Sequence, residues 1–176
     1  SHGLKLWEAL LAAGEPLGVM PYGTEALHVM RAEKGFIMIG DETDGTVTPQ
    51  DLGLHWAISK KKDDFLGKRA QGRVDLTRHG RKQLVGLLTE NPKERLPDGA
   101  HAVARPDAST PNPTLGHVTS TYMSPTLGRS IAMALIDGGA ERMGEVLTFP
   151  VGDGKVMKAR VVDPVFYDPE GGKLHA

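Results

Sequence analysis

The sequence predicts an α+β protein in which a mainly helical part precedes a small antiparallel β-barrel. In residues 1–74, apolar side chains recur at helical spacing between breaks rich in glycine and proline. From residue 84 onward, short apolar runs alternate with turn sequences, a pattern typical of several short strands. The polar, basic residues 75–82 separate the two patterns. We therefore expect a first part in residues 1–74 and a barrel domain in residues 75–176.

The composition is that of a globular protein without a strong charge of either sign. Of its 176 residues, 39% are hydrophobic, and 21 basic residues balance 22 acidic ones, which gives a formal net charge of −1. This balance favours neither a nucleic acid nor a membrane as partner, and the sequence has no apolar run of about 18 residues that could span a bilayer. The lack of cysteine excludes a thiol nucleophile and a disulfide scaffold, and it fits a cytoplasmic protein.

A first helix is expected in residues 3–13. Leu4, Trp7 and Leu10 recur there at helical spacing, so we expect an amphipathic helix whose apolar stripe, Trp7 included, packs against the core. Residues 16–23 are too rich in proline and glycine for regular structure and are interpreted as a linker.

A second helix is expected to begin at Thr24, which can cap it, and to end at Gly35. Glu33 lies in its last turn, where a carboxylate opposes the negative end of the helix dipole. From the residues alone, the simplest interpretation of Glu33 is a solvated charge paired with Arg31 or Lys34.

Several shorter features follow this helix. Residues 40–45 hold three carboxylates but lack the spacing of a calcium loop, so we expect a solvated turn. Residues 48–51 have the features of a helix amino terminus: Thr48 as the cap residue, Pro49 in the first turn and the acidic Asp51 at the third position. Trp56 follows in an apolar run and is expected in the core, and residues 65–70 predict another short helix that Gly72 ends.

The barrel is predicted from apolar runs and turns. A buried strand is expected at residues 84–88 and an alternating one at residues 100–104. Two further strands, residues 115–122 and 131–136, flank a tight connection, and residues 145–151 and 155–162 form a hairpin around Gly152-Asp153-Gly154.

Two groups of motifs carry a resemblance to a known family. The first comprises Arg31-Ala32-Glu33-Lys34-Gly35-Phe36, Thr48-Pro49, Gly53-Leu54, Trp56 and Phe65-Leu66-Gly67-Lys68-Arg69-Ala70; the second runs from Gly116-His117-Val118-Thr119-Ser120 to Ser124-Pro125-Thr126-Leu127-Gly128-Arg129. Together they resemble the glycine-cleavage T-protein (aminomethyltransferase) superfamily. Within it, the Glu-Lys-Gly-Phe sequence is similar to the carboxy-terminal part of the alpha subunits of heterotetrameric sarcosine oxidases. The resemblance implies a partial T-protein-like folate-binding α/β part followed by the family's β-barrel.

The resemblance gives Glu33 a specific role. In the T-protein, the glutamate of the Arg-x-Glu-x-Gly motif binds the pterin of folate, and this residue corresponds to Glu33. A pterin presents a ring N–H beside an exocyclic amine, and an ionised carboxylate can accept both hydrogen bonds.

Two further residues are expected to bind the cofactor. The family has a basic side chain that helps to hold the folate, and Lys62 is the nearest match, although it replaces an arginine and so lacks the forked guanidinium. A solvated charge run is the alternative for Lys62 and its neighbours Lys60 and Lys61. The T-protein also ends in an aromatic segment near folate, for which Tyr167 is the candidate, with packing against the barrel as the equal alternative.

Other chemistry is not indicated by the sequence. It has no G-x-G-x-x-G loop, phosphate-binding loop or G-x-S-x-G elbow, and its seven histidines show no spacing typical of metal ligands. His117 is expected to be a barrel residue. The T-protein's catalytic aspartate belongs to a segment upstream of these motifs, so no catalytic residue is predicted here.

The leading hypothesis is the tetrahydrofolate-binding, carboxy-terminal portion of a sarcosine oxidase alpha subunit. The resemblance implies that the complete enzyme uses FAD, FMN and NAD, none bound by this chain, to demethylate sarcosine oxidatively, and that tetrahydrofolate accepts the one-carbon unit. Its partners would be the other sarcosine oxidase subunits, and we expect little or no turnover by this chain alone. The alternatives are a fragment of an aminomethyltransferase or dimethylglycine dehydrogenase, and a non-catalytic folate-binding or subunit-interaction module.

Overall fold

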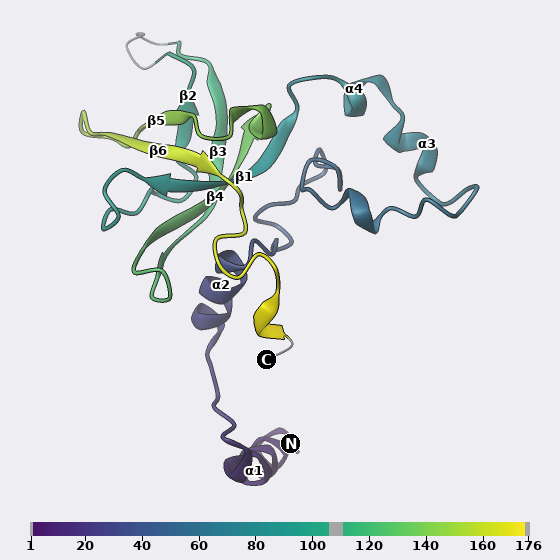
Figure 1. The fold of residues 1–176 in the computed structure, drawn as a ribbon, viewed down its shortest axis with the longest axis vertical. Coiled ribbons are helices and arrows are strands. Elements are labelled where there is room, and N and C mark those ends of the chain that lie inside the picture. The colour runs from purple at the N-terminus through teal and green to yellow at the C-terminus, as the bar shows by residue number, and fades with distance from the viewer. Residues whose placement is uncertain (1, 106–110, 175–176) are drawn as a thin grey trace.

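A computed structural model describes residues 2–105 and 111–174. Its centre is a closed barrel of antiparallel strands in the order β1-β4-β3-β2-β5-β6 (Figure 1). The strands are β1 (Lys82–Thr89), β2 (His101–Val103), β3 (Thr114–Ser124), β4 (Arg129–Asp137), β5 (Val146–Pro150) and β6 (Val156–Val162). The predicted α+β class and small antiparallel barrel are confirmed.

The barrel interior is filled by side chains from alternate positions along the strands. In β6, for example, Met157, Ala159 and Val161 are buried while the residues between them are not. This alternation is expected where one face of a strand points into a core and the other into solvent. Phe149 of β5 is fully buried in the same core.

Strand β4 is buried on both faces. Ala132, Ala134 and Ile136 belong to the barrel core, whereas Ile131, Met133 and Leu135 belong to a second core outside the barrel wall. Their alternation along one strand sends the two sets to opposite sides. The outer core also contains residues from before the barrel and from after it: Ala32, Ile37, Val47, Leu52 and Phe166.

The helices lie outside the barrel. They are α1 (Gly3–Gly14), α2 (Thr24–Glu33), α3 (Lys68–Gln71) and α4 (Val74–Thr77), together with the 3-10 turns η1 (Glu15–Leu17), η2 (His55–Ala57), η3 (Gly139–Arg142) and η4 (Gly172–Leu174). Helix α2 lies beneath the barrel, beside the connection between β3 and β4 (Figure 1). Gly23 takes the N-cap position of α2, so Thr24 is its first residue and not its cap. No helix in the described part of the chain is long and apolar enough to cross a membrane.

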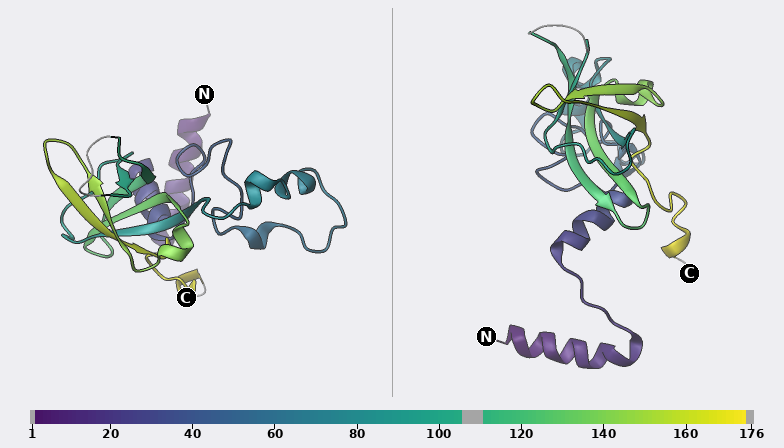
Figure 2. Two further views of the ribbon diagram at one scale, coloured as in Figure 1. Left: turned by 90° about the horizontal axis from the view of Figure 1, so that it is seen from above. Right: turned by 90° about the vertical axis from the view of Figure 1, so that its left-hand side faces the viewer.

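Helix α1 forms as predicted, but its apolar stripe does not pack against the core. The helix stands apart from the barrel at the end of an extended connection (Figures 1 and 2). Leu4, Trp7 and Leu10 are 65%, 51% and 60% exposed. The expectation that Trp7 is a core residue is therefore wrong: helical periodicity identifies the apolar face but not the surface that covers it.

The helix expected to begin at residues 48–51 does not form. The Asp51 carboxylate accepts hydrogen bonds from the Thr48 amide and hydroxyl, both at 2.8 Å, which is the local geometry of a helix cap. The chain then turns at Gly53, whose φ is +72°, and only the short η2 follows. Trp56 is 73% exposed, so its predicted place in the core is also wrong. By contrast, α3 ends at Gly72 as predicted.

A buried ion pair joins the 48–53 turn to the barrel. Arg81, immediately before β1, donates to the Asp51 carboxylate at 2.6 Å, and the Leu84 amide donates to the Asp51 carbonyl at 2.8 Å. Burial alone would raise the pKa of Asp51, but the hydrogen bonds from Arg81 and Thr48 outweigh it and hold this pKa below its usual value. The same pair raises the pKa of Arg81.

Candidate functional site

The carboxylate of Glu33 is turned toward the barrel at the end of α2. Glu33 exposes only 5% of its surface. Its Oε1 accepts a hydrogen bond from the Ser124 hydroxyl at 2.5 Å, and its Oε2 accepts one from Thr126 at 3.0 Å. These hydroxyls offset the unfavourable position of a negative charge at a helix carboxyl end. The interpretation of Glu33 as a solvated charge is therefore wrong.

The end of α2 is also held by the carboxy-terminal segment. The amides of Phe166 and Tyr167 donate to the Glu33 carbonyl at 3.0 and 2.9 Å. Gly35 has φ +68°, and a β-carbon there would lie 2.7 Å from the Pro164 carbonyl oxygen, so the close approach of the two segments requires glycine. Lys34 completes the contact through an ion pair with Asp168 at 3.3 Å.

A buried network of charges fixes the opposite side of α2. The Arg31 guanidinium donates to Glu42 at 2.8 Å and to the Ser120 hydroxyl on β3 at 2.6 Å. Glu42 is fully buried and also accepts hydrogen bonds from the Met38 amide and from the Thr119 and Ser120 hydroxyls. The turn at residues 40–45 is therefore not simply solvated, because Glu42 anchors it to the barrel.

A hollow of about 630 Å³ opens beside Glu33, between α2 and the barrel. We call it the Glu33 hollow. Its walls are mainly apolar and come from Ala26, Val29 and Met30 of α2, Met123 of β3 and Pro125 of the hairpin turn, with the Tyr122 ring among them. The charged residues Glu25, Glu33 and Arg95 and the hydroxyl residue Thr126 complete the lining. A mainly apolar hollow with few polar groups is the usual form of a small-molecule site.

The structure brings together some of the residues predicted from the sequence, but not all. Glu33 lines the hollow, and the Tyr167 backbone bonds to Glu33, although Tyr167 does not line the hollow and its side chain is only partly buried. Lys62 is exposed in an irregular segment outside the hollow, where its amide bonds to Ser59. The binding roles of Glu33, Lys62 and Tyr167 stay predictions.

Sequence reasoning missed the residues that hold Glu33 and complete its surroundings. In the sequence, Ser124 and Thr126 are recognisable only as part of a motif, and nothing local predicts that both hydroxyls bind the Glu33 carboxylate. Arg95 precedes a buried leucine in a polar stretch, and nothing in its spacing relates it to Glu33. The folded barrel places the segments that carry Arg95, Ser124 and Thr126 near Glu33, and no pattern along the chain shows this.

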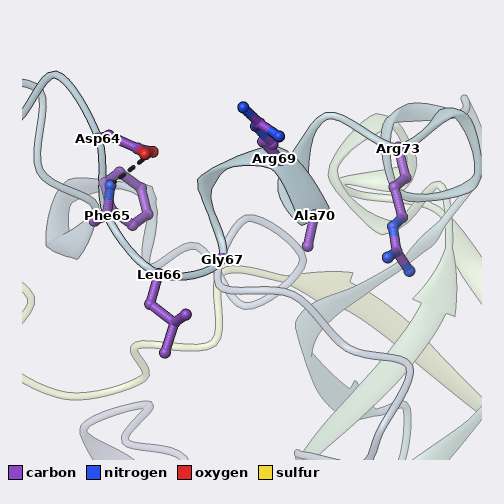
Figure 3. Close-up of a pocket in the computed structure, with 7 residues that line it drawn as sticks. All are labelled: Asp64, Phe65, Leu66, Gly67, Arg69, Ala70 and Arg73. Carbon is purple, nitrogen blue, oxygen red and sulfur yellow. Dashed lines mark hydrogen bonds between the residues drawn. The ribbon is translucent and has the colours of Figure 1, made fainter.

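A second hollow, of about 550 Å³, lies near α3 but offers little chemistry (Figure 3). Its residues come from one exposed segment between Asp64 and Arg73. In Figure 3 the side chains of Leu66 and Arg73 point to one side of the segment and that of Arg69 to the other, and Leu66 is fully exposed. With no buried polar group aimed into it, this hollow is a weaker candidate than the Glu33 hollow.

No group of three or more metal-binding side chains occurs among the described residues. Two histidines on β2 and β3, His101 and His117, lie with their ring centroids 5.9 Å apart. Burial lowers the pKa of His117, and the positive charge of Lys82 lowers it further. This favours the neutral ring and fits the predicted place of His117 in the barrel.

Comparison with known proteins identifies the class to which this fold belongs. Residues 82–168 match the family model of the glycine cleavage T-protein C-terminal barrel domain, and residues 1–62 match the GCVT N-terminal domain. The crystal structure of the glycine cleavage system aminomethyltransferase T from Bartonella henselae superposes with a TM-score of 0.76 over 94% of this chain and 44% of that one; at 24% identity it supports the fold alone. The chain belongs to the glycine-cleavage T-protein superfamily.

Within that superfamily, the predicted similarity to sarcosine oxidase alpha subunits is confirmed. The chain is 49% identical to sarcosine oxidase subunit alpha of Corynebacterium sp. (strain U-96) over 174 residues, which are 98% of this chain and 18% of that protein. The corresponding subunit of Rhizobium meliloti (strain 1021) is 41% identical over 99% of this chain and 18% of its own length. The aminomethyltransferase of Desulfitobacterium hafniense (strain DSM 10664 / DCB-2) is 32% identical over 97% of this chain and 44% of its own. The chain thus spans less than half of each relative.

Proposed function

We propose that this chain is a tetrahydrofolate-binding portion of a sarcosine oxidase alpha subunit. The observation that carries the proposal is the buried Glu33 carboxylate at the edge of a mainly apolar hollow. A pterin is a flat heterocycle that gains from an apolar wall and needs acceptors for its adjacent N–H groups. Glu33 and its surroundings supply both.

The hydrogen bonds that Glu33 already accepts leave capacity for a ligand. An ionised carboxylate has about four lone-pair sites on its two oxygens. The Ser124 and Thr126 hydroxyls use one site on each oxygen. One further site on each oxygen remains, which is what a pair of adjacent pterin donors requires. The two hydroxyls also orient the carboxylate before the ligand arrives, which lowers the entropic cost of binding.

The roles of Tyr167 and Lys62 form part of the same proposal. Tyr167 would help to close the site, since its backbone already bonds to the Glu33 carbonyl. Lys62 would reach the ligand only from outside the hollow, because it is absent from the lining. The division into a folate-binding part in residues 1–74 and a barrel domain in residues 75–176 also stays a proposal.

The activity of the whole enzyme is proposed from the relatives. Oxidative demethylation of sarcosine, transfer of its one-carbon unit to tetrahydrofolate, and assembly with other sarcosine oxidase subunits would belong to the complete protein. FAD, FMN and NAD would act there, outside this chain. A cytoplasmic location stays a prediction from the sequence.

A subunit-interaction role is the second candidate, and one observation favours it. Large apolar side chains are exposed along α1 and along the segment around α3, including Leu66, which is fully exposed, and Val74, which is 85% exposed. Exposed apolar surface of this kind is typical of interfaces. This role is compatible with folate binding in the Glu33 hollow.

Calorimetric titration of tetrahydrofolate into the 176-residue chain tests the folate proposal. Glu33→Gln keeps the size of the side chain but replaces one acceptor oxygen with a donor, so binding should be lost. Glu25→Gln is the matched control, because Glu25 lines the same hollow and lies on the same helix. It should not weaken binding, because it removes no acceptor proposed for the pterin and only a charge that repels an anionic tail. Equal affinity in wild type and Glu33→Gln, or no binding by a folded wild-type chain, would contradict the proposal.

A further inference from the structure

The Glu33 hollow contains a cation that the proposed pterin contact does not use. Arg95 lies in the connection between β1 and β2 and lines the hollow together with Glu33. Resting on the folate function proposed above, we infer that Arg95 binds the carboxylates of the glutamate tail of the ligand. The hollow would then recognise both ends of the molecule: its heterocycle at Glu33 and its acidic end at Arg95.

The backbone that carries Arg95 is fixed by the barrel. Leu96, the next residue, is fully buried in the barrel core. The Pro92 carbonyl accepts a hydrogen bond from the Ser130 amide of β4 at 2.8 Å, and the Glu94 amide bonds to the Asn91 carbonyl at 3.0 Å. A side chain on such an anchored segment loses little backbone freedom on binding, which favours a defined site.

The Arg95 side chain is available to an external anion. It is exposed, and within residues 2–105 and 111–174 no hydrogen bond or ion pair engages its guanidinium. The adjacent acid, Glu94, is directed to Lys155 at 3.5 Å. Glu25 is the other carboxylate of the lining besides Glu33 and lies in the first turn of α2.

The chemistry of arginine suits this role better than that of the lysines near residue 62. A guanidinium presents parallel N–H groups that match a carboxylate in a bidentate way, whereas an ammonium acts as a point charge. Lys60, Lys61 and Lys62 are all exposed, and none of them lines the Glu33 hollow. Arg95 therefore combines a forked guanidinium with a place in the lining of the hollow.

Two ligands that differ only in the tail test the inference. Tetrahydrofolate carries the glutamate, and the primary amide of tetrahydropteroate has the same pterin and aminobenzoyl group but no carboxylate. Each is titrated into the wild-type chain and into Arg95→Met, with thermal unfolding to verify that the variant is folded. A charge-assisted hydrogen bond at a partly exposed site predicts that Arg95→Met weakens tetrahydrofolate binding about tenfold. Binding of the amide, which has no carboxylate for Arg95 to bind, should not change.

Further variants make the result specific. Arg95→Lys should recover part of the lost affinity, since it restores the charge but not the fork. Lys93→Met removes an exposed cation from the same connection and should bind like wild type. Lys62→Met removes the residue expected from the sequence, which lies outside the hollow, and should weaken binding less than Arg95→Met does. If Lys62→Met weakens tetrahydrofolate binding and Arg95→Met does not, the inference is overturned in favour of Lys62.

The experiment separates failure of this inference from failure of the folate function. If wild type binds both ligands and Arg95→Met weakens them equally or not at all, the tail contact is wrong while the pterin contact at Glu33 stands. If wild type binds neither ligand, the folate function itself is wrong, and the role of Arg95 is rejected with it.

Discussion

The hydroxyl oxygen of Ser124 lies 2.5 Å from Oε1 of Glu33 and also accepts a hydrogen bond from the Leu127 amide at 2.9 Å. Because the amide supplies its own proton, the serine proton must point at the carboxylate. The β3–β4 turn thereby sets the direction of the hydrogen bond that holds Glu33. A serine in the barrel and a glutamate at the end of a helix act as one unit.

Replacement of Ser124 by alanine should destabilise the protein. Glu33 would lose a donor in a buried place, and loss of such a hydrogen bond costs about 1–3 kcal/mol. Chemical unfolding of Ser124→Ala measures the loss. Ser130→Ala is a matched control, because Ser130 is also buried and its hydroxyl has no hydrogen-bond partner within the described residues. Equal stability of the two variants would show that the Ser124–Glu33 contact contributes little.

Replacement of Glu42 by glutamine should be among the most damaging changes of a single side chain. Glu42 is fully buried and accepts hydrogen bonds from Arg31, Met38, Thr119 and Ser120. Removing the charge leaves Arg31 without its buried partner, which typically costs about 3–5 kcal/mol.

Asp41→Asn provides the comparison for Glu42→Gln. Asp41 also pairs with Arg31, at 3.2 Å, but its side chain is 40% exposed. Its loss should cost at most about 1 kcal/mol. Urea unfolding of both variants checks the difference, and similar losses would mean that burial does not control the strength of this network.

The Asp51–Arg81 pair predicts a dependence of stability on pH. The pKa of Asp51 in the folded protein lies below its usual value, so the pair's contribution is fully present above about pH 4 and is lost as the pH falls through the folded-state pKa. Arg81 stays protonated throughout. Asp51→Asn should cost about 3 kcal/mol near neutral pH. Unfolding measured from neutral to acidic pH should show this difference shrinking at the acid end, and a constant difference would contradict the linkage.

The exposed face of α1 predicts self-association of the 176-residue chain. Leu4, Trp7 and Leu10 form an uncovered apolar surface, and such surfaces tend to associate. Replacing Leu4 and Leu10 by serine should reduce the average mass measured by sedimentation at high protein concentration. Serine at Val74, which is 85% exposed on α4, is the control for a single apolar residue elsewhere. If the α1 variant has the same mass distribution as wild type, association does not use this helix.

The barrel could be predicted from the sequence because its signals are local. Each strand carries its own apolar pattern, and the turns between strands carry glycine or proline; residues 131–136 and the hairpin around Gly152 were found for this reason. Helix α2 was identified from its ends, with an error of one residue at its cap. These features depend on neighbours in the chain.

The failures concern residues whose surroundings come from distant segments. Trp7 and Trp56 belong to apolar patterns, but an apolar pattern does not show which other segment, if any, packs against the side chain. In the sequence, Glu42 does not differ from other acidic loop residues. Its burial follows from the Thr119 and Ser120 hydroxyls of β3, which donate to it. Likewise Thr48 and Asp51 form the contacts of a helix cap without a helix, because Arg81 binds the same carboxylate. Arg95 and Glu33 come to line one hollow only in the folded barrel.

The position of β4 between two cores has a consequence for how the protein opens. Its inner side chains, such as Ala134 and Ile136, support the barrel, and its outer ones, such as Met133 and Leu135, support α2 and the ends of the chain around it. Because each face of this strand packs against a different core, we expect its backbone amides to exchange with deuterium only through global unfolding. Helix α1 and the segment around α3 are not packed between two cores, so their amides should exchange much faster than those of β4.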